Sequence, residues 1–213
     1  MGRTVKARAS RRRPGAGAST PLADKLLDAA AALIIERGPQ GFSLREVARR
    51  ARVSEAAPYW HFSSKEALLA AVAEQGFVGL ADAMTDVRAR VKDPRRRLQE
   101  LGVAYVRFAL AHPSHLRIMF GPEIHDKTAH PSLRAAGDHA FGLLVATIIE
   151  AQRAGHVRRG DPEALAVAAW SMVHGLSALL IDAQLEEYAR TPREAERLAA
   201  NVTKVLETGL ARR

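Results

Sequence analysis

The 213-residue chain contains no cysteine. Without thiols it can form no disulfide framework, no thiolate nucleophile and no cysteine-ligated zinc site. This composition suits a reducing compartment, so we expect the protein to be cytoplasmic.

We also expect no secretory signal, because the basic start runs into the sequence RRRPGAGAST and not into an apolar segment. Its longest apolar run, Ala164 to Ile181, approaches the roughly 18 residues of a membrane span. Polar and small residues such as Ser171, His174 and Ser177 interrupt this run. We interpret it as a helix packed between other helices, with a membrane span as the alternative, and expect no membrane partner.

Acidic residues are absent from the first 19 positions, which hold six Lys and Arg residues. We expect residues 1–19 to form a disordered basic tail. Residues 1–70 hold 13 basic and 6 acidic residues, a balance of +7, whereas the whole chain has a net charge of +9. The positive charge is therefore concentrated at one end, which indicates a polyanionic partner such as nucleic acid.

No segment shows the alternation of a β-strand, and helix starts recur instead. Four of them pair an N-cap residue with a following proline, and two resemble capping boxes, Ser43 to Glu46 and Ser63 to Glu66. Gly38 and Gly155 fit the ends of two helices. The pattern predicts an all-α protein with about nine helices, at residues 21–37, 44–51, 55–61, 64–90, 94–111, 113–120, 132–154, 162–188 and 192–210.

The second and third of these helices are short and are joined by a tight turn near Arg52. Two such helices after a longer one form a helix-turn-helix in a three-helix setting. Side chains that can donate to phosphate follow at once, namely Tyr59, Trp60, His61 and Lys65. This combination favours DNA binding over a simple helical hairpin.

The sequence SLREVARRARVSEAAPYWHFSSKEALL closely resembles the DNA-binding domain of the tetracycline-repressor (TetR) family. WSMVHG, Trp170 to Gly175, is similar to the family's subgroup with a Trp…His-Gly signature. The resemblance implies a helix-turn-helix DNA-binding domain at residues 20–66 and a helical ligand-binding and dimerisation domain at residues 67–213. It further implies a homodimeric regulator, usually a repressor, that leaves a palindromic operator when a small molecule binds.

The resemblance also assigns roles in DNA binding. Arg45 falls on a position that reads a base, for which guanine is the expected partner. Ser54 is expected to cap the recognition helix, and Glu55, Ala56 and Ala57 to face base edges. Phosphate contacts are expected from Ser43, Tyr59, His61 and Lys65; Trp60 is assigned to the DNA face, with packing against the core as its alternative.

Two residues depart from the family pattern. Pro58 stands where leucine is usual, and we expect it at the fourth helical position, where it removes one intrahelical hydrogen bond. Arg52 stands where the turn usually has glycine, so a positive φ at this position would strain it by about 1 kcal/mol.

The C-terminal part supplies candidate surfaces for a ligand and for a second subunit. Small and apolar residues at helical spacing suggest a dimer interface, with packing inside one subunit as the alternative. The predicted interface comprises Ala168, Ser171, Gly175, Ala178, Leu198, Val202, Val205 and Leu206. The candidate ligand-binding residues, each of which could also be ordinary core, are Tyr105, Phe108, His115, Met119, Phe120, Phe141, Trp170 and His174.

Three other functions have less support in the sequence. The histidines between His112 and His130 lack the cysteine or paired acidic ligands that would frame a metal site, so we expect no metal and no cofactor. An enzyme is not expected, because no nucleophile with a base and no phosphate loop is present. A nonspecific DNA-compacting protein would also fit the basic end, and it predicts equal affinity for all duplexes.

Overall fold

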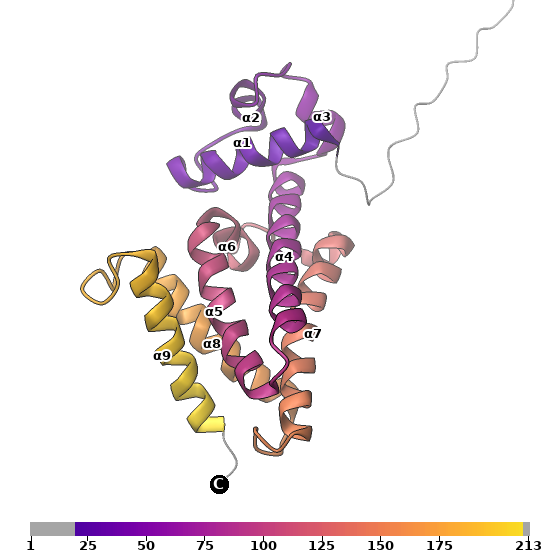
Figure 1. The fold of residues 1–213 in the computed structure, drawn as a ribbon. Helices are drawn as coiled ribbons and strands as arrows, with labels where there is room; N and C mark the ends of the chain where they lie inside the picture. Colours follow the sequence, from indigo (N-terminus) through magenta and orange to yellow (C-terminus); the bar gives the residue numbers. More distant parts are fainter. Residues whose placement is uncertain (1–19, 211–213) are drawn as a thin grey trace, which may run out of the picture.

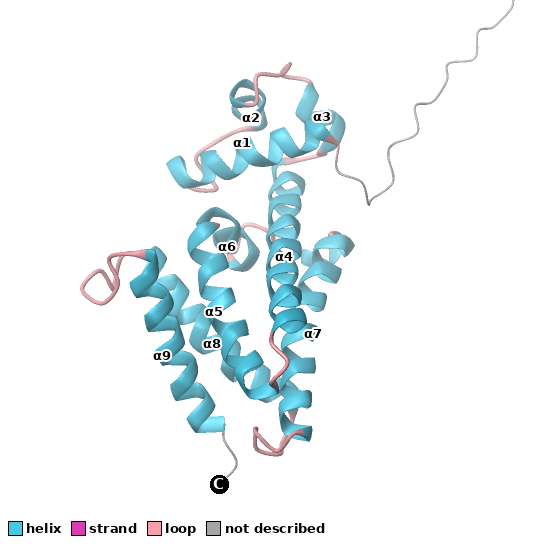
Figure 2. Ribbon diagram, viewed as in Figure 1, coloured by secondary structure: helices cyan, strands magenta, loops and turns pink. Residues whose placement is uncertain are grey.

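The computed structural model describes residues 20–210, apart from the side chains of residues 206–208 and 210. Over this range the chain forms nine α-helices and one short 3₁₀ helix, with no strand, which confirms the predicted fold class (Figure 2). The predicted basic tail lies outside the described residues. The elements are α1 (Pro21–Arg37), α2 (Leu44–Arg50), α3 (Ala57–His61), α4 (Lys65–Arg90), α5 (Pro94–Ala111), α6 (Pro113–Phe120), η1 (Lys127–Ala129), α7 (Pro131–Arg153), α8 (Pro162–Ile181) and α9 (Pro192–Leu210).

Local sequence determines most helix starts. The side chains of Thr20, Asp93 and Asp161 accept hydrogen bonds from the first turns of α1, α5 and α8, each followed by proline. Ser43 and Glu46 form the predicted capping box. The second predicted box is wrong: Ser64, and not Ser63, caps α4, so Glu66 is not at the third helical position that a capping box requires. Glu66 accepts instead from the backbone N–H of His125 at 3.1 Å.

Helix α8 ends at Ile181, seven residues before the predicted end at Tyr188. Ala183 adopts a left-handed conformation with a φ of 56°, and the N–H of Gln184 donates to the carbonyl oxygen of Leu179. This arrangement is a helix stop that usually contains glycine. Alanine is the strongest helix former, so no local signal indicated a stop at this position.

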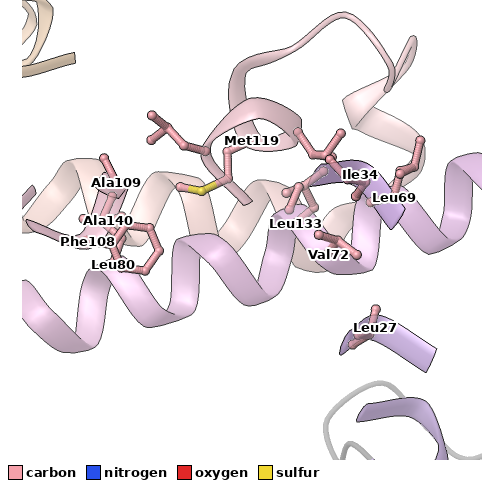
Figure 3. Close-up of a cluster of buried hydrophobic side chains, with 14 of the residues drawn as sticks. Leu27, Ile34, Leu69, Val72, Leu80, Phe108, Ala109, Met119, Leu133 and Ala140 are labelled. Atoms are coloured by element: carbon pink, nitrogen blue, oxygen red, sulfur yellow. The ribbon is translucent and has the colours of Figure 1, made fainter. Parts of the chain in front are cut away.

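The helices form a small head and a larger body. Figure 1 shows α1, α2 and α3 at one end of the molecule, and α4 leading from them into the body. In the body α4 packs against α5, α6 and α7, while α5 also contacts α8 and α9. Buried side chains continue from the head into the body, and Figure 3 shows Ile34 of α1 near Leu69 of α4, with Met119 and Leu133 farther along. Head and body therefore share one apolar core.

Two of the described helices, α4 and α8, are long and apolar enough to cross a membrane by length and composition alone. Half of the apolar window of α4 is buried inside the protein, but only a third of that of α8. Helix α8 packs against α5, α7 and α9. The predicted packing between other helices thus covers part of α8, and an apolar face stays exposed.

Arg52 has a φ of 55° in the turn between α2 and α3, as its departure from the family pattern suggested. We expect Arg52→Gly to raise the free energy of unfolding by up to about 1 kcal/mol, because glycine adopts this conformation without strain. Urea unfolding measures the change. The control, Arg49→Gly inside α2, should lower stability by a similar amount; a loss of stability in Arg52→Gly as well would contradict this interpretation.

Candidate nucleic-acid interface and apolar cavity

Ion pairs and apolar contacts hold helix α2 against α1. Arg50 donates two hydrogen bonds to Glu36, at 2.7 and 2.6 Å, and Arg37 donates to Glu46 at 2.7 Å. Hydrogen bonds from the backbone and side chain of Ser43 lower the pKa of Glu46, so this carboxylate stays ionised at the start of α2. Because one face of α2 is buried in the head, the opposite face, which carries Arg45, is exposed to solvent.

Helix α3 is shorter than predicted. It begins at Ala57, and Ser54 contributes only its carbonyl oxygen, which accepts from the N–H of Ala57 at 2.9 Å. The predicted side-chain cap by Ser54 is therefore wrong, and Glu55 and Ala56 lie in a turn. Pro58 sits in the first turn and is fully buried, so it removes no intrahelical hydrogen bond, contrary to the predicted fourth position.

Most of the predicted DNA-binding residues face solvent at this end of the head. The side chains of Arg45 and Glu55 are 74% and 76% exposed, and Trp60 is 72% exposed, so Trp60 does not pack against the core. Ala57 is buried, so it cannot face a base edge. Ser43, Ser54, Ala56 and Tyr59 are exposed, while His61 and Lys65 are half-buried.

Three contacts orient charged groups on this surface. The Nε atom of Arg45 lies 3.8 Å from a carboxylate oxygen of Glu55, which links α2 to the turn before α3. Such an exposed pair is weak and leaves both groups able to bind other partners. The ammonium of Lys65 donates to the carbonyl oxygen of Gln40 and lies 4.5 Å above the ring of Phe42, and burial lowers its pKa.

An apolar cavity of about 190 Å³ lies in the body, between α4, α5, α6, α7 and α8. Four predicted ligand-binding residues line it, namely Tyr105, Phe120, Phe141 and Trp170. The other lining residues were not predicted. Aliphatic and glycine positions on α4 and α7 look like ordinary core, and Phe77, although aromatic, lies on a long helix where a phenylalanine usually packs inside. The unpredicted lining residues are Phe77, Leu80, Met84, Gly137, Ala140 and Leu144.

The other four predicted ligand-binding residues lie outside this wall. Phe108 and Met119 are buried in the core, where Met119 packs closely against Gly76 of α4. His115 lies near Gln75, with 3.3 Å between its Nε2 and the amide oxygen, and burial lowers its pKa. His174 lies behind the wall, where it contacts residues that do line the cavity.

Tyr105, His174 and Trp170 form a hydrogen-bonded group beside the cavity. The indole N–H of Trp170 donates to the Tyr105 hydroxyl at 3.3 Å, and this hydroxyl lies 2.8 Å from Nδ1 of His174. Burial raises the pKa of Tyr105 and lowers that of His174, so both side chains are neutral at pH 7. The polar atoms near the cavity are thus bonded to one another.

The predicted dimer residues of α8 and α9 are only partly covered. Ala168, Ser171 and Val205 are exposed, and Gly175, Ala178, Leu198 and Val202 are half-buried. The side chain of Leu206 lies outside the described residues. Val167 and Leu179 of α8 were not predicted for the interface, but both are apolar and exposed, at 48% and 46%.

A metal-binding cluster is not found among residues 20–210: no three histidine, aspartate or glutamate side chains there are grouped to hold an ion. His112 and His115 do meet, with their ring centres 5.6 Å apart.

Comparison with known proteins identifies the family. Residues 26–72 match the profile described as bacterial regulatory proteins, tetR family, and residues 98–206 match a tetracyclin repressor-like C-terminal domain. The chain belongs to the TetR family. It is therefore a DNA-binding transcription regulator and not an enzyme.

Solved structures agree with this assignment. A protein of unknown function from Rhodococcus sp. RHA1 is 33% identical, with a TM-score of 0.77 over 94% of this chain and 100% of that one. The TetR-family regulator PfmR from Thermus thermophilus is 24% identical, with a TM-score of 0.70 over 88% and 99% of the two chains. FadR from Bacillus subtilis, solved with stearoyl-CoA, shares the fold at 14% identity, with a TM-score of 0.74 over 88% and 98%. No curated protein matches the chain.

Proposed function

We propose that this TetR-family protein is a cytoplasmic, homodimeric repressor that leaves a palindromic operator when a small apolar molecule enters its cavity. The main support is one arrangement: base- and phosphate-binding side chains lie exposed on a head that α4 joins directly to the wall of an apolar cavity. The Trp…His-Gly subgroup and the division at residues 66 and 67 remain predictions.

On the DNA side, each exposed side chain suits a particular partner. The guanidinium of Arg45 can donate two hydrogen bonds to guanine, and Glu55 can accept from the amino group of cytosine. Ala56 offers its methyl group to thymine, whereas the buried Ala57 is not proposed as a contact. Ser43, Ser54, Tyr59, Trp60, His61 and Lys65 surround these groups, and we assign them to the sugar-phosphate backbone.

The dimer is supported by the uncovered apolar face of α8. Val167, Ser171, Gly175 and Leu179 follow one another at intervals of four residues, which places them on one side of the helix. A Cβ atom added at Gly175 would meet nothing within 4 Å, so another helix has room to approach there. With α9, this face would form a four-helix bundle across a two-fold axis, and two heads would then meet successive major grooves roughly 34–36 Å apart.

A path for ligand control runs through α6 and α4. Phe120 lines the cavity, and its neighbour Met119 lies against Gly76 of α4, where an added Cβ would come within 2.6 Å of the sulfur atom. A ligand that displaces Phe120 would therefore shift α4 and the head above it. If the ligand prefers the shifted state, it lowers operator affinity, and a coupling of about 1–3 kcal/mol is usual.

Selection of bound duplexes from a random pool tests this proposal. We expect one short, imperfect palindrome to be enriched, and we expect some members of a panel of apolar compounds to release it. Equal recovery of all sequences would instead support a nonspecific DNA-compacting protein.

A further inference from the structure

The apolar cavity is small for a regulator's ligand site. Its volume is about 190 Å³, whereas an engineered apolar cavity of roughly 150 Å³ takes up benzene. Pockets for drug-sized ligands are larger, at roughly 300–1,000 Å³. The space therefore suits a compact molecule slightly larger than benzene.

Aromatic rings make up half of the cavity wall. The chain has two tryptophans, three tyrosines and six phenylalanines, and five of these eleven residues line this single space. Phe120 is central, because its ring lies 5.4 Å from that of Phe77 in an edge-to-face arrangement and 5.3 Å from that of Trp170. Rings held at these angles to one another offer both faces and edges, which favours a flat aromatic guest over a flexible chain.

No group in the cavity wall can pair with a charged ligand. None of its ten residues carries a charge, and the one hydroxyl among them, on Tyr105, is bonded to Trp170 and His174. Transfer of an unpaired carboxylate or ammonium group into such surroundings is strongly unfavourable. A charged guest is therefore excluded, although the aromatic rings alone would tolerate a cation.

From these observations we propose that the effector is an uncharged aromatic compound of one or two fused rings, which binds among Phe77, Phe120, Phe141 and Trp170. This inference rests on the proposed ligand-responsive function and narrows it to one chemical class. It requires no hydrogen bond between the effector and the wall, since the indole N–H of Trp170 and the hydroxyl of Tyr105 are already bonded.

Direct binding measurements without DNA test the class. Isothermal titration with naphthalene should show saturable binding to the full-length protein. We expect 1-naphthoate, which adds one negative charge, and 1-decanol, which replaces the rings by a flexible chain with the same number of carbons, to bind about tenfold more weakly or worse. Equal or tighter binding of either, or no binding of naphthalene, would overturn the proposal.

Two substitutions locate the site. Ala140→Leu should reduce naphthalene affinity about tenfold or more, because its added carbons fill the cavity, whereas Ala135→Leu on the exposed side of α7 should not. If Ala140→Leu does not fold, Gly137→Ala replaces it. A Cβ atom there would lie 3.7 Å from the ring of Phe77, an ordinary contact, and Gly142→Ala, with nothing within 4 Å, is its control.

Unchanged naphthalene affinity in Ala140→Leu or Gly137→Ala would contradict binding in this cavity. Operator binding by the unliganded wild-type protein is measured separately by fluorescence anisotropy. The proposed effector class can therefore be disproved by the titrations while operator binding is retained. A loss of operator binding would likewise be detected even if naphthalene binds.

Discussion

Arg45→Ala is expected to reduce operator affinity by about 30-fold or more. A bidentate contact to guanine contributes roughly 1–3 kcal/mol, and a dimer loses it twice. The side chain is 74% exposed, and its one ion pair, with Glu55, is weak, so the substitution should leave the fold unchanged. Anisotropy titration of the selected operator measures the loss, and unfolding curves check stability.

The controls separate base recognition from charge. Arg45→Lys keeps the charge but not the planar fork, so it should lose most of the specificity at one base pair in each half-site. Arg134→Ala removes an arginine of similar exposure from α7 in the body, and it should change affinity little. Comparable losses in Arg134→Ala and Arg45→Ala would show that attraction by overall charge accounts for binding.

Gly175→Glu is expected to convert the dimer into monomers. Within one protomer the new side chain meets nothing within 4 Å, and glutamate is a better helix former than glycine. Across the proposed interface, however, it would place a charge and extra volume where two copies of α8 approach. Operator affinity should then fall by about 10²–10⁴-fold, because each head binds its half-site alone.

Sedimentation measures the change in mass. Gly142→Glu is the matched control, since this glycine of α7 also has nothing within 4 Å and lies outside the proposed interface. It should sediment like the wild type. A Gly175→Glu protein that remains dimeric would require the subunits to associate through another surface.

Local signals made much of this structure predictable. Thr20 and Asp93 carry their capping oxygens next to a proline, so the starts of α1 and α5 depend on neighbouring residues only. Arg52 could be placed in a strained turn because the family pattern has glycine there. The early end of α8 was missed, since Ala183 has a φ of 56° that alanine rarely adopts and that its sequence does not signal.

The candidate sites were harder to predict because they depend on which helix faces meet. Tyr105 and Trp170 stand out in a sequence with few aromatic residues, but Leu80 and Ala140 form cavity wall only because five helices, α4 to α8, meet around one space. Ala57 lies within the motif that reads DNA, yet the shorter α3 turns it inward. Composition and spacing indicate which interactions a side chain can make. The packing of the helices decides whether DNA or a ligand can reach that side chain.

Hydroxyl-radical footprinting on the selected operator is the most direct test of the central claim. That claim is that two copies of the protein bind one duplex through the exposed surface of α2 and α3. We predict two protected patches related by a two-fold axis, with centres about one helical turn apart, roughly 34–36 Å along the duplex. A single patch, or even protection along the whole fragment, would contradict the account.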